Sequence, residues 1–221
     1  MSPVLGMTLL GGKCDNLTEI PGLYSIIIFN TLGLLNQNYM YKLTTRLFLA
    51  SFILLMASKT HAQGLETIKA QMVKDWQRAK DYTLDYLNTM PADKYSFKAT
   101  DSIRSFAQQM LHLAAANCML MSNVTTDKIP AGISFTLEQR ASAQTKDSVV
   151  YYVTTSYDFA RNAVANSDVS KWWDVKKIFG RFDETVFAMM NKTFEHQTHH
   201  RGQTTIYIRL VGIKPPNERL F

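Results

Sequence analysis

A charge-free run of 12 residues, Leu47 to Ser58, limits how much of this chain can belong to one folded domain. Two basic residues precede the run, and Thr60-His61-Ala62 follows it with small residues where a signal peptidase cleaves. The run is shorter than the ~20 apolar residues that span a bilayer. The sequence therefore predicts a signal peptide over residues 40–62 and an exported, periplasmic or secreted, mature chain over residues 63–221.

Residues 1–39 lie upstream of the predicted signal peptide and contain a second apolar run, Gly22 to Leu35. A signal peptide begins at the start codon, so we interpret residues 1–39 as an upstream extension from a mis-called start. The alternative is a membrane hairpin made from both apolar runs. The first run has 14 residues and is interrupted by Asn30 and Gly33, which makes that hairpin less attractive.

The predicted mature chain has 159 residues, which suits one domain with a core of its own. Its 20 basic and 16 acidic residues are evenly mixed, without a run of Lys or Arg. We therefore expect no nucleic-acid partner, and contact with a membrane only during export. Cys118 is the single cysteine of this part, so no disulfide can form within it, and a small buried hydrophobic residue is expected there.

Four segments of the predicted mature chain have the residue pattern of a helix. The first carries an apolar stripe that includes Ile68 and Trp76, and Pro91 follows its end. The second contains no charged residue and follows Ser105, a residue suited to an N-cap, so it should be buried on most of its surface. The four segments are Gly64–Thr89, Phe106–Ser122, Asp147–Asn166 and Phe182–Leu210.

The third of these segments is ambiguous by composition. Its SVVYYVTT stretch is typical of a strand, but the pattern continues through YDFARNAVA without a turn signal, and that length favours a helix. Val124–Thr145 and Ser167–Gly180 are predicted connections, the former with a short helix, and Gly212 ends the last helix. The predicted fold is all-α, a four-helix bundle with two longer connections.

Three histidines can form a metal site if two of these helices face each other. His196 and His200 are four residues apart and lie on one helix face, where they form either a metal-binding pair or a solvated polar patch. His112 lies on the charge-free helix and needs a partner there, either a neighbour in the core or a metal ion.

Together His112, His196 and His200 would give three nitrogen ligands and leave coordination positions open. With no cysteine or carboxylate in the set, the divalent ion that fits is Zn²⁺ or Ni²⁺. His199 lies about 100° around the helix from His200 and is expected at the rim or the surface.

The segments RSFAQQMLHLAAAN and HQTHHRGQTTIYIRLVGIKPP resemble the DinB/YfiT-like superfamily of metal-binding four-helix bundles, named for DNA-damage-inducible proteins. The resemblance extends from Trp76 to Pro216 and implies the metal ligands His112, His196 and His200. It also implies an activity among thiol S-transferases, thiol-dependent maleylpyruvate isomerases or hydrolases, in which the metal activates a bound thiol or water. The predicted export argues against a thiol S-transferase activity, because low-molecular-weight thiols are chiefly cytosolic.

Two classes of function follow. One is an exported metal-dependent hydrolase or transferase of a small substrate, for which the sequence identifies neither substrate nor catalytic residues. The other is a non-catalytic metal- or ligand-binding bundle in the periplasm. No general base is apparent, because no glutamate lies within a turn of His112 and Glu195 points about 100° away from His196. A homodimer is compatible with the sequence.

Several polar and aromatic side chains have roles that the sequence leaves open. Gln203 or Asn117 would either orient a metal-bound imidazole or be a surface or capping amide. Arg209 would bind an anionic substrate or a structural partner. Three tyrosines of the third helix would line the pocket or, as is more usual for aromatic residues of an amphipathic helix, belong to the core; they are Tyr151, Tyr152 and Tyr157.

Overall fold

The computed structural model describes the backbone of residues 21–123, 125 and 127–221, and within these the side chains of residues 36–56 and from 63 onward. Residues 1–20 of the proposed upstream extension, and the side chains at the predicted cleavage site, lie outside the described residues. By its internal contacts the chain divides into two units, one that ends at Ala57 and one that runs from Ser58 to Phe221.

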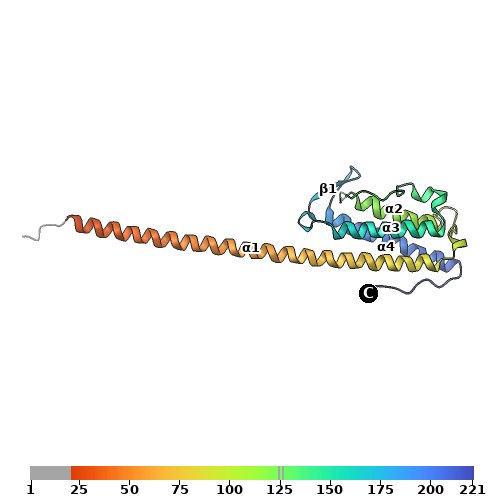
Figure 1. Cartoon of the computed structure of the whole chain (residues 1–221), viewed down its shortest axis with the longest axis horizontal. Helices are drawn as coiled ribbons and strands as arrows, with labels where there is room; N and C mark the ends of the chain where they lie inside the picture. The colour runs from red at the N-terminus through yellow and green to blue at the C-terminus, as the bar shows by residue number, and fades with distance from the viewer. Residues whose placement is uncertain (1–20, 124, 126) are drawn as a thin grey trace, which may run out of the picture. The chain divides into compact units, whose positions relative to one another are not determined.

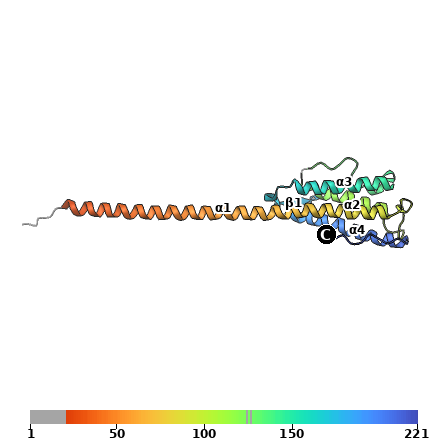
Figure 2. The same ribbon diagram turned by 60° about the horizontal axis from the view of Figure 1, so that its bottom comes forward.

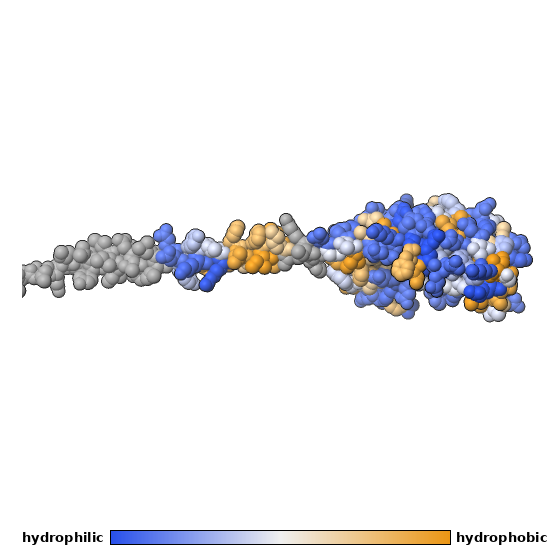
Figure 3. Space-filling model, turned by 90° about the horizontal axis from the view of Figure 1, so that it is seen from below, coloured by the Kyte–Doolittle hydropathy of each residue, from blue (hydrophilic) through white to orange (hydrophobic). Residues whose placement is uncertain are grey.

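Helix α1 spans Pro21–Thr89. It ends where the sequence predicts but begins long before Gly64, so the predicted start is wrong. The reason is that no proline occurs between Pro21 and Pro91, and isolated glycines are tolerated within a helix. Side chains 36–56 are all exposed, and their hydrophobic members gather in one stretch of the helix (Figure 3). No helix in the described part of the chain combines the length and apolarity needed to cross a membrane.

The second unit is a four-helix bundle, which confirms the predicted fold class. Three further helices pack with the C-terminal part of α1 (Figures 1 and 2): α2, Phe106–Met121; α3, Lys146–Ala165; and α4, Val186–Leu210. Helix α2 contacts both α3 and α4. Short 3-10 helices lie in the connections, at Ala92–Lys94, Leu137–Gln139, Ala141–Ala143 and Val169–Lys171.

The core of the bundle is centred on Trp76. Its ring packs edge-on against Tyr157 of α3 and Phe194 of α4, with ring centroids 5.8 and 5.2 Å away. Ile68, earlier on the same stripe, is exposed, so the stripe becomes part of the core only near Trp76. Cys118 is fully buried as expected, and burial raises the pKa of its thiol to about 12, which leaves it unreactive.

Hydrogen bonds at their first turns fix where α2 and α3 begin. The Ser105 side chain accepts from the Gln108 amide, and the Gln108 side chain accepts from the Ser105 amide, so the predicted N-cap is a full capping box. Thr145 caps α3 with a single bond, in which its hydroxyl accepts from the Ser148 amide. The Asp147–Asn166 segment is therefore a helix rather than a strand, as its length favours.

A small β-hairpin replaces the predicted start of the last helix. Strands β1 (Val175–Ile178) and β2 (Phe182–Thr185) pair antiparallel, and the three-residue turn between them has positive φ at Phe179 and Gly180. The prediction that Phe182 begins a helix is wrong, because Phe182–Thr185 pairs as a strand. Helix α4 instead begins at Val186, where the Thr185 hydroxyl accepts from the Ala188 amide.

We expect residues 63–221 to fold without the preceding residues, because Leu65 is the first core residue in the described part of the chain. The far-UV circular dichroism spectrum of this fragment should show helical minima and one cooperative thermal transition. A fragment that begins at Lys80 is the control. It lacks Trp76, whose loss from a core costs about 3–5 kcal/mol, and should unfold at a clearly lower temperature. A disordered spectrum for residues 63–221 would contradict the expectation.

Candidate metal centre

Helices α2 and α4 bring the three predicted histidines together. His112 comes from the middle of α2, while His196 and His200 lie one turn apart on α4. Each offers one ring nitrogen, and these three atoms lie within 4.8 Å of one another, as a group that could hold a metal ion. The ring centroid of His200 is 4.6 Å from that of His112 and 4.3 Å from that of His196.

The His112 ring is oriented by a carboxylate that the sequence analysis missed. Its Nδ1–H donates to Glu138 Oε2 at 2.8 Å, which leaves Nε2 for a metal ion. Arg104 Nε in turn donates to both carboxylate oxygens of Glu138 at 3.0 Å. This arrangement is the one in which a carboxylate fixes the tautomer of a metal-binding histidine and raises its basicity.

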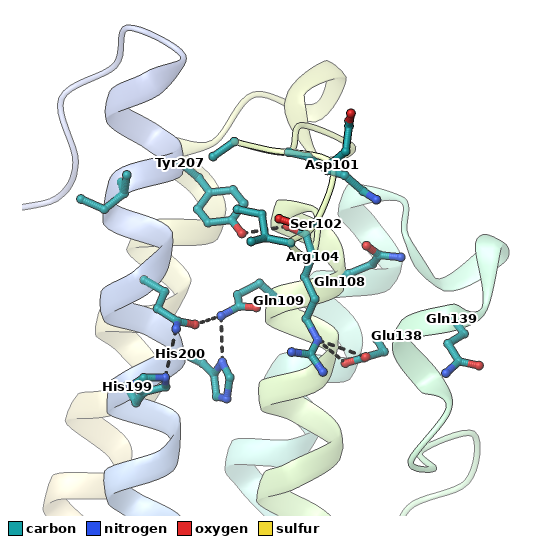
Figure 4. Close-up of a pocket in the computed structure, with 15 residues that line it drawn as sticks. Asp101, Ser102, Arg104, Gln108, Gln109, Glu138, Gln139, His199, His200 and Tyr207 are labelled. Carbon is teal, nitrogen blue, oxygen red and sulfur yellow. Dashed lines mark hydrogen bonds and ion pairs between the residues drawn. The ribbon is translucent and has the colours of Figure 1, made fainter.

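His200 is oriented by an amide chain (Figure 4). Its Nδ1 lies 2.8 Å from the Gln109 side-chain nitrogen, the Gln109 amide contacts Gln203, and Gln203 Nε2 lies 3.0 Å from His199 Nε2. If both amides turn by 180°, every contact keeps one donor and one acceptor. His199 then donates to Gln203, Gln203 to Gln109, and His200 Nδ1–H to the Gln109 oxygen. In that state His200 Nε2 is free to bind a metal ion.

One ring nitrogen of His196 lies where a shared metal ion would bind. Its Nε2 lies 3.1 Å from His200 Nε2, so one ring must donate to the other. Two nitrogens that bind one tetrahedral zinc ion at ~2.0–2.1 Å lie ~3.3 Å apart, close to this separation. His196 Nδ1 is buried and has no hydrogen-bond partner within the described residues. The three residues therefore fit a divalent ion by donor type, and His196 and His200 also by spacing.

The electrostatic surroundings keep these imidazoles neutral. Burial lowers the pKa of His200 to about 3 and that of His196 to about 4, and the other histidines and Arg104 add to both shifts. Burial, with Arg104 as the next cause, also lowers the pKa of His112, against the opposing effect of Glu138. Only neutral imidazole binds a metal ion, so the site is in the binding state at neutral pH.

Two cavities border the histidines. The larger, of about 820 Å³, borders His200 and has a mixed polar and apolar lining (Figure 4); its polar walls include Ser102, Arg104, Gln108, Gln109, His199 and Tyr207, and its apolar ones Ala99, Ile103 and Ile206. The smaller, of about 190 Å³, borders His112 and His196 and is otherwise apolar. A small molecule in either cavity would lie next to the histidines.

Of the other polar residues singled out from the sequence, two lie near the histidine group and one does not. His199 lies exposed at the rim of the large cavity, as expected, and Gln203 acts on His200 only through Gln109. Asn117 donates to Ser156 in the core, so its suggested role beside a histidine is wrong.

The arginine and the three tyrosines singled out from the sequence lie away from the two cavities. Arg209 is exposed and does not border the large cavity. Tyr157 is a core residue, Tyr151 is exposed, and Tyr152 accepts from Arg140, so none of the three borders either cavity.

Glu138 should matter for metal affinity because it fixes His112. We expect Glu138→Ala to weaken metal binding about 10- to 100-fold, the usual effect of removing a partner of a metal-binding histidine. Gln139→Ala, at the next residue of the same turn, is the matched control and should bind metal like the wild type. Competition with a chromophoric chelator measures both affinities. Equal losses in the two variants would show that the turn, rather than the carboxylate, is what matters.

Comparison with known proteins agrees with this description. The DinB family model matches residues 56–219. The uncharacterized protein YrdA of Bacillus subtilis (strain 168) is 25% identical over 149 residues, which cover 65% of this chain and 83% of that protein.

Two crystal structures of DinB-like proteins have a similar fold. One, from Bacillus cereus, has a TM-score of 0.54 and 13% identity, and covers 66% of this chain and 95% of its own. The other, YjoA from Bacillus subtilis, has a TM-score of 0.51 and 19% identity, and covers 68% and 96%. The resemblance found in the two histidine-containing segments is thereby confirmed, and since the family model spans most of its length, the chain belongs to the DinB family.

Proposed function

We propose that this protein binds one divalent metal ion, Zn²⁺ or Ni²⁺, through His112, His196 and His200, and that it is an exported hydrolase or transferase of a small molecule. The observation that carries the proposal is the group of three imidazoles, one buried and two half-buried, kept neutral by their surroundings and bordered by two cavities. A structural site would use four protein ligands, whereas three leave a position for substrate or water.

The chain's own residues have distinct tasks at such a site. Glu138 and Gln109 hold His112 and His200 with Nε2 directed inward. Arg104 holds Glu138 through Nε and adds positive charge beside the large cavity, which favours a substrate with a polar or anionic part. The metal ion would supply Lewis acidity, lowering the pKa of a bound water or thiol.

Export is the second part of the proposal and rests on the sequence of residues 40–62. N-terminal sequencing of the protein from fractions of its native cells tests it, with Gln63 as the expected first residue. An intact chain that keeps residues 1–62 in the inner membrane would contradict export. The same fractions would show whether the protein associates with membrane after cleavage, which the proposal does not expect.

Cobalt substitution tests the metal site and its open position together. Co²⁺ bound by three histidines and one exchangeable ligand should give strong visible absorption, and added azide should shift it by taking the exchangeable position. Failure to take up Zn²⁺, Ni²⁺ or Co²⁺ would contradict the proposal. A cobalt spectrum that azide leaves unchanged would contradict an open catalytic position.

A further inference from the structure

The small cavity beside His112 and His196 is built differently from the large one. Its floor is one stripe of α2 that continues from His112 at helical spacing: Ala115, Ala116, Met119 and Leu120. Phe135, from the connection between α2 and α3, forms the outer wall. The Phe135 ring is 61% exposed, and its centroid lies 6.1 Å from that of Phe179 in the hairpin turn. Apart from the two imidazoles, every lining residue of this cavity is apolar.

The two cavities present different chemistry beside the histidines. The wall next to His200 combines amides, a hydroxyl, a phenol and the Arg104 guanidinium with the apolar side chains of Ala99, Ile103 and Ile206. Around His112 and His196 lie methyl, thioether and aromatic groups. Water in an apolar cavity finds few hydrogen-bond partners, so an apolar group displaces it favourably. A molecule that reaches the histidines is therefore expected to direct its apolar end to the small cavity.

We propose that the small cavity binds an apolar substituent of the substrate, a phenyl or short branched alkyl group, while the polar remainder occupies the large cavity. The size follows from the volume of about 190 Å³. An apolar cavity of ~150 Å³ holds a benzene molecule. Ala115 and Ala116 provide this space, because any larger side chain at either position would fill it. This inference rests on the proposed metal site and names the class of substrate that it accepts.

Two thiols of different shape test this assignment on the cobalt-loaded full-length chain. Ethanethiol and phenylmethanethiol both bind a metal ion through sulfur, and absorption from sulfur-to-cobalt charge transfer reports their binding. Each buried CH₂ contributes about fourfold in affinity. Phenylmethanethiol should therefore bind about tenfold or more tightly than ethanethiol.

Ala116→Leu fills the small cavity and should remove this preference, because phenylmethanethiol then loses much more affinity than ethanethiol. Ala99→Leu is the matched control, because Ala99 lines the large cavity, and it should keep the preference. Met119→Ala is a second variant that enlarges the small cavity. It should raise the affinity for naphthylmethanethiol severalfold relative to the wild type.

The possible results separate this inference from the proposed function. If the chain takes up no cobalt, the metal site and this inference both fail. If cobalt and ethanethiol bind, but the wild type shows no preference or Ala116→Leu keeps it, only the inference is overturned. If Ala116→Leu does not fold, an unchanged naphthylmethanethiol affinity in Met119→Ala overturns the inference.

Discussion

Replacing any one of His112, His196 or His200 by alanine is expected to remove most of the bound metal. The described residues offer three histidine donors to the ion, and two of them hold it much more weakly than three. Metal bound only by the folded state stabilises it, by about 4 kcal/mol when free metal is a thousandfold above Kd. For a domain of this size that corresponds to a rise in Tm of roughly 10 °C. Each variant should lose both the metal and this metal-dependent rise.

His199→Ala is the matched control, since it removes the same side chain one residue from a proposed ligand. His199 is exposed, contacts Gln203 and packs edge-on against the His200 ring, but its nitrogens are not among the three that group together. The variant should therefore retain the metal and most of the rise in Tm. Metal content per protein, measured by mass spectrometry with thermal unfolding in excess metal, compares the four variants. Loss of metal from His199→Ala, together with retention in His196→Ala or His200→Ala, would refute the ligand assignment.

The helices and the histidine group could be predicted because their signals are local. A spacing of four residues places His196 and His200 on one face of α4 whatever surrounds the helix. The charge-free sequence of α2 requires burial, and burial beside α4 brings His112 to the same place. These inferences need only helix geometry and hydrophobic burial.

The residues that orient the histidines could not be predicted in the same way. Glu138 lies in a single 3-10 turn within a long connection, 26 positions after His112, and no periodicity links the two. Gln109 precedes His112 by three residues on α2, so its position on the same helix face was readable. Nothing in the sequence, however, showed that His200 would lie against it. Such contacts depend on how connections fold over the bundle.

The hairpin illustrates the limit of composition. The sequence around the Lys176-Lys177 pair predicts a connection, followed by a helix that starts at Phe182. Its structure instead depends on the turn at Phe179 and Gly180 and on the Thr185 cap. Glycine supplies the positive φ at low cost, but a phenylalanine in that conformation is not foreseen from its propensity.

The metal-free protein is expected to lose stability as the pH falls from about 6.5 to about 4. In the unfolded chain His196 and His200 have their ordinary pKa of 6.5, whereas in the folded state the pKa of His196 is lowered to about 4 and that of His200 to about 3. Between these values the unfolded state binds more protons, so acid favours unfolding. The free energy of unfolding is therefore highest above pH 6.5, where these histidines are neutral in both states, and it decreases as the pH falls below 6.5.

Each histidine contributes about 1.4 kcal/mol per pH unit in this window, so the free energy of unfolding should fall by roughly 2 to 3 kcal/mol per unit. Urea unfolding of the metal-free protein at several pH values measures this slope. The doubly substituted His196→Gln/His200→Gln protein is the control and should lose most of it. An equal slope in that control would assign the acid sensitivity to other groups.

The same lowered pKa values extend metal binding to a lower pH. The ordinary pKa of ~6.5 predicts that protons displace the metal near that pH. In the folded protein, however, burial keeps His196 and His200 neutral to about pH 4, so protons should compete with the metal only at lower pH. Metal retention measured by dialysis at pH 5.5 distinguishes the two cases, because only the buried site should still hold its ion. Release at pH 6 to 6.5 would mean that the imidazoles are hydrated in solution, contrary to their burial in α2 and α4.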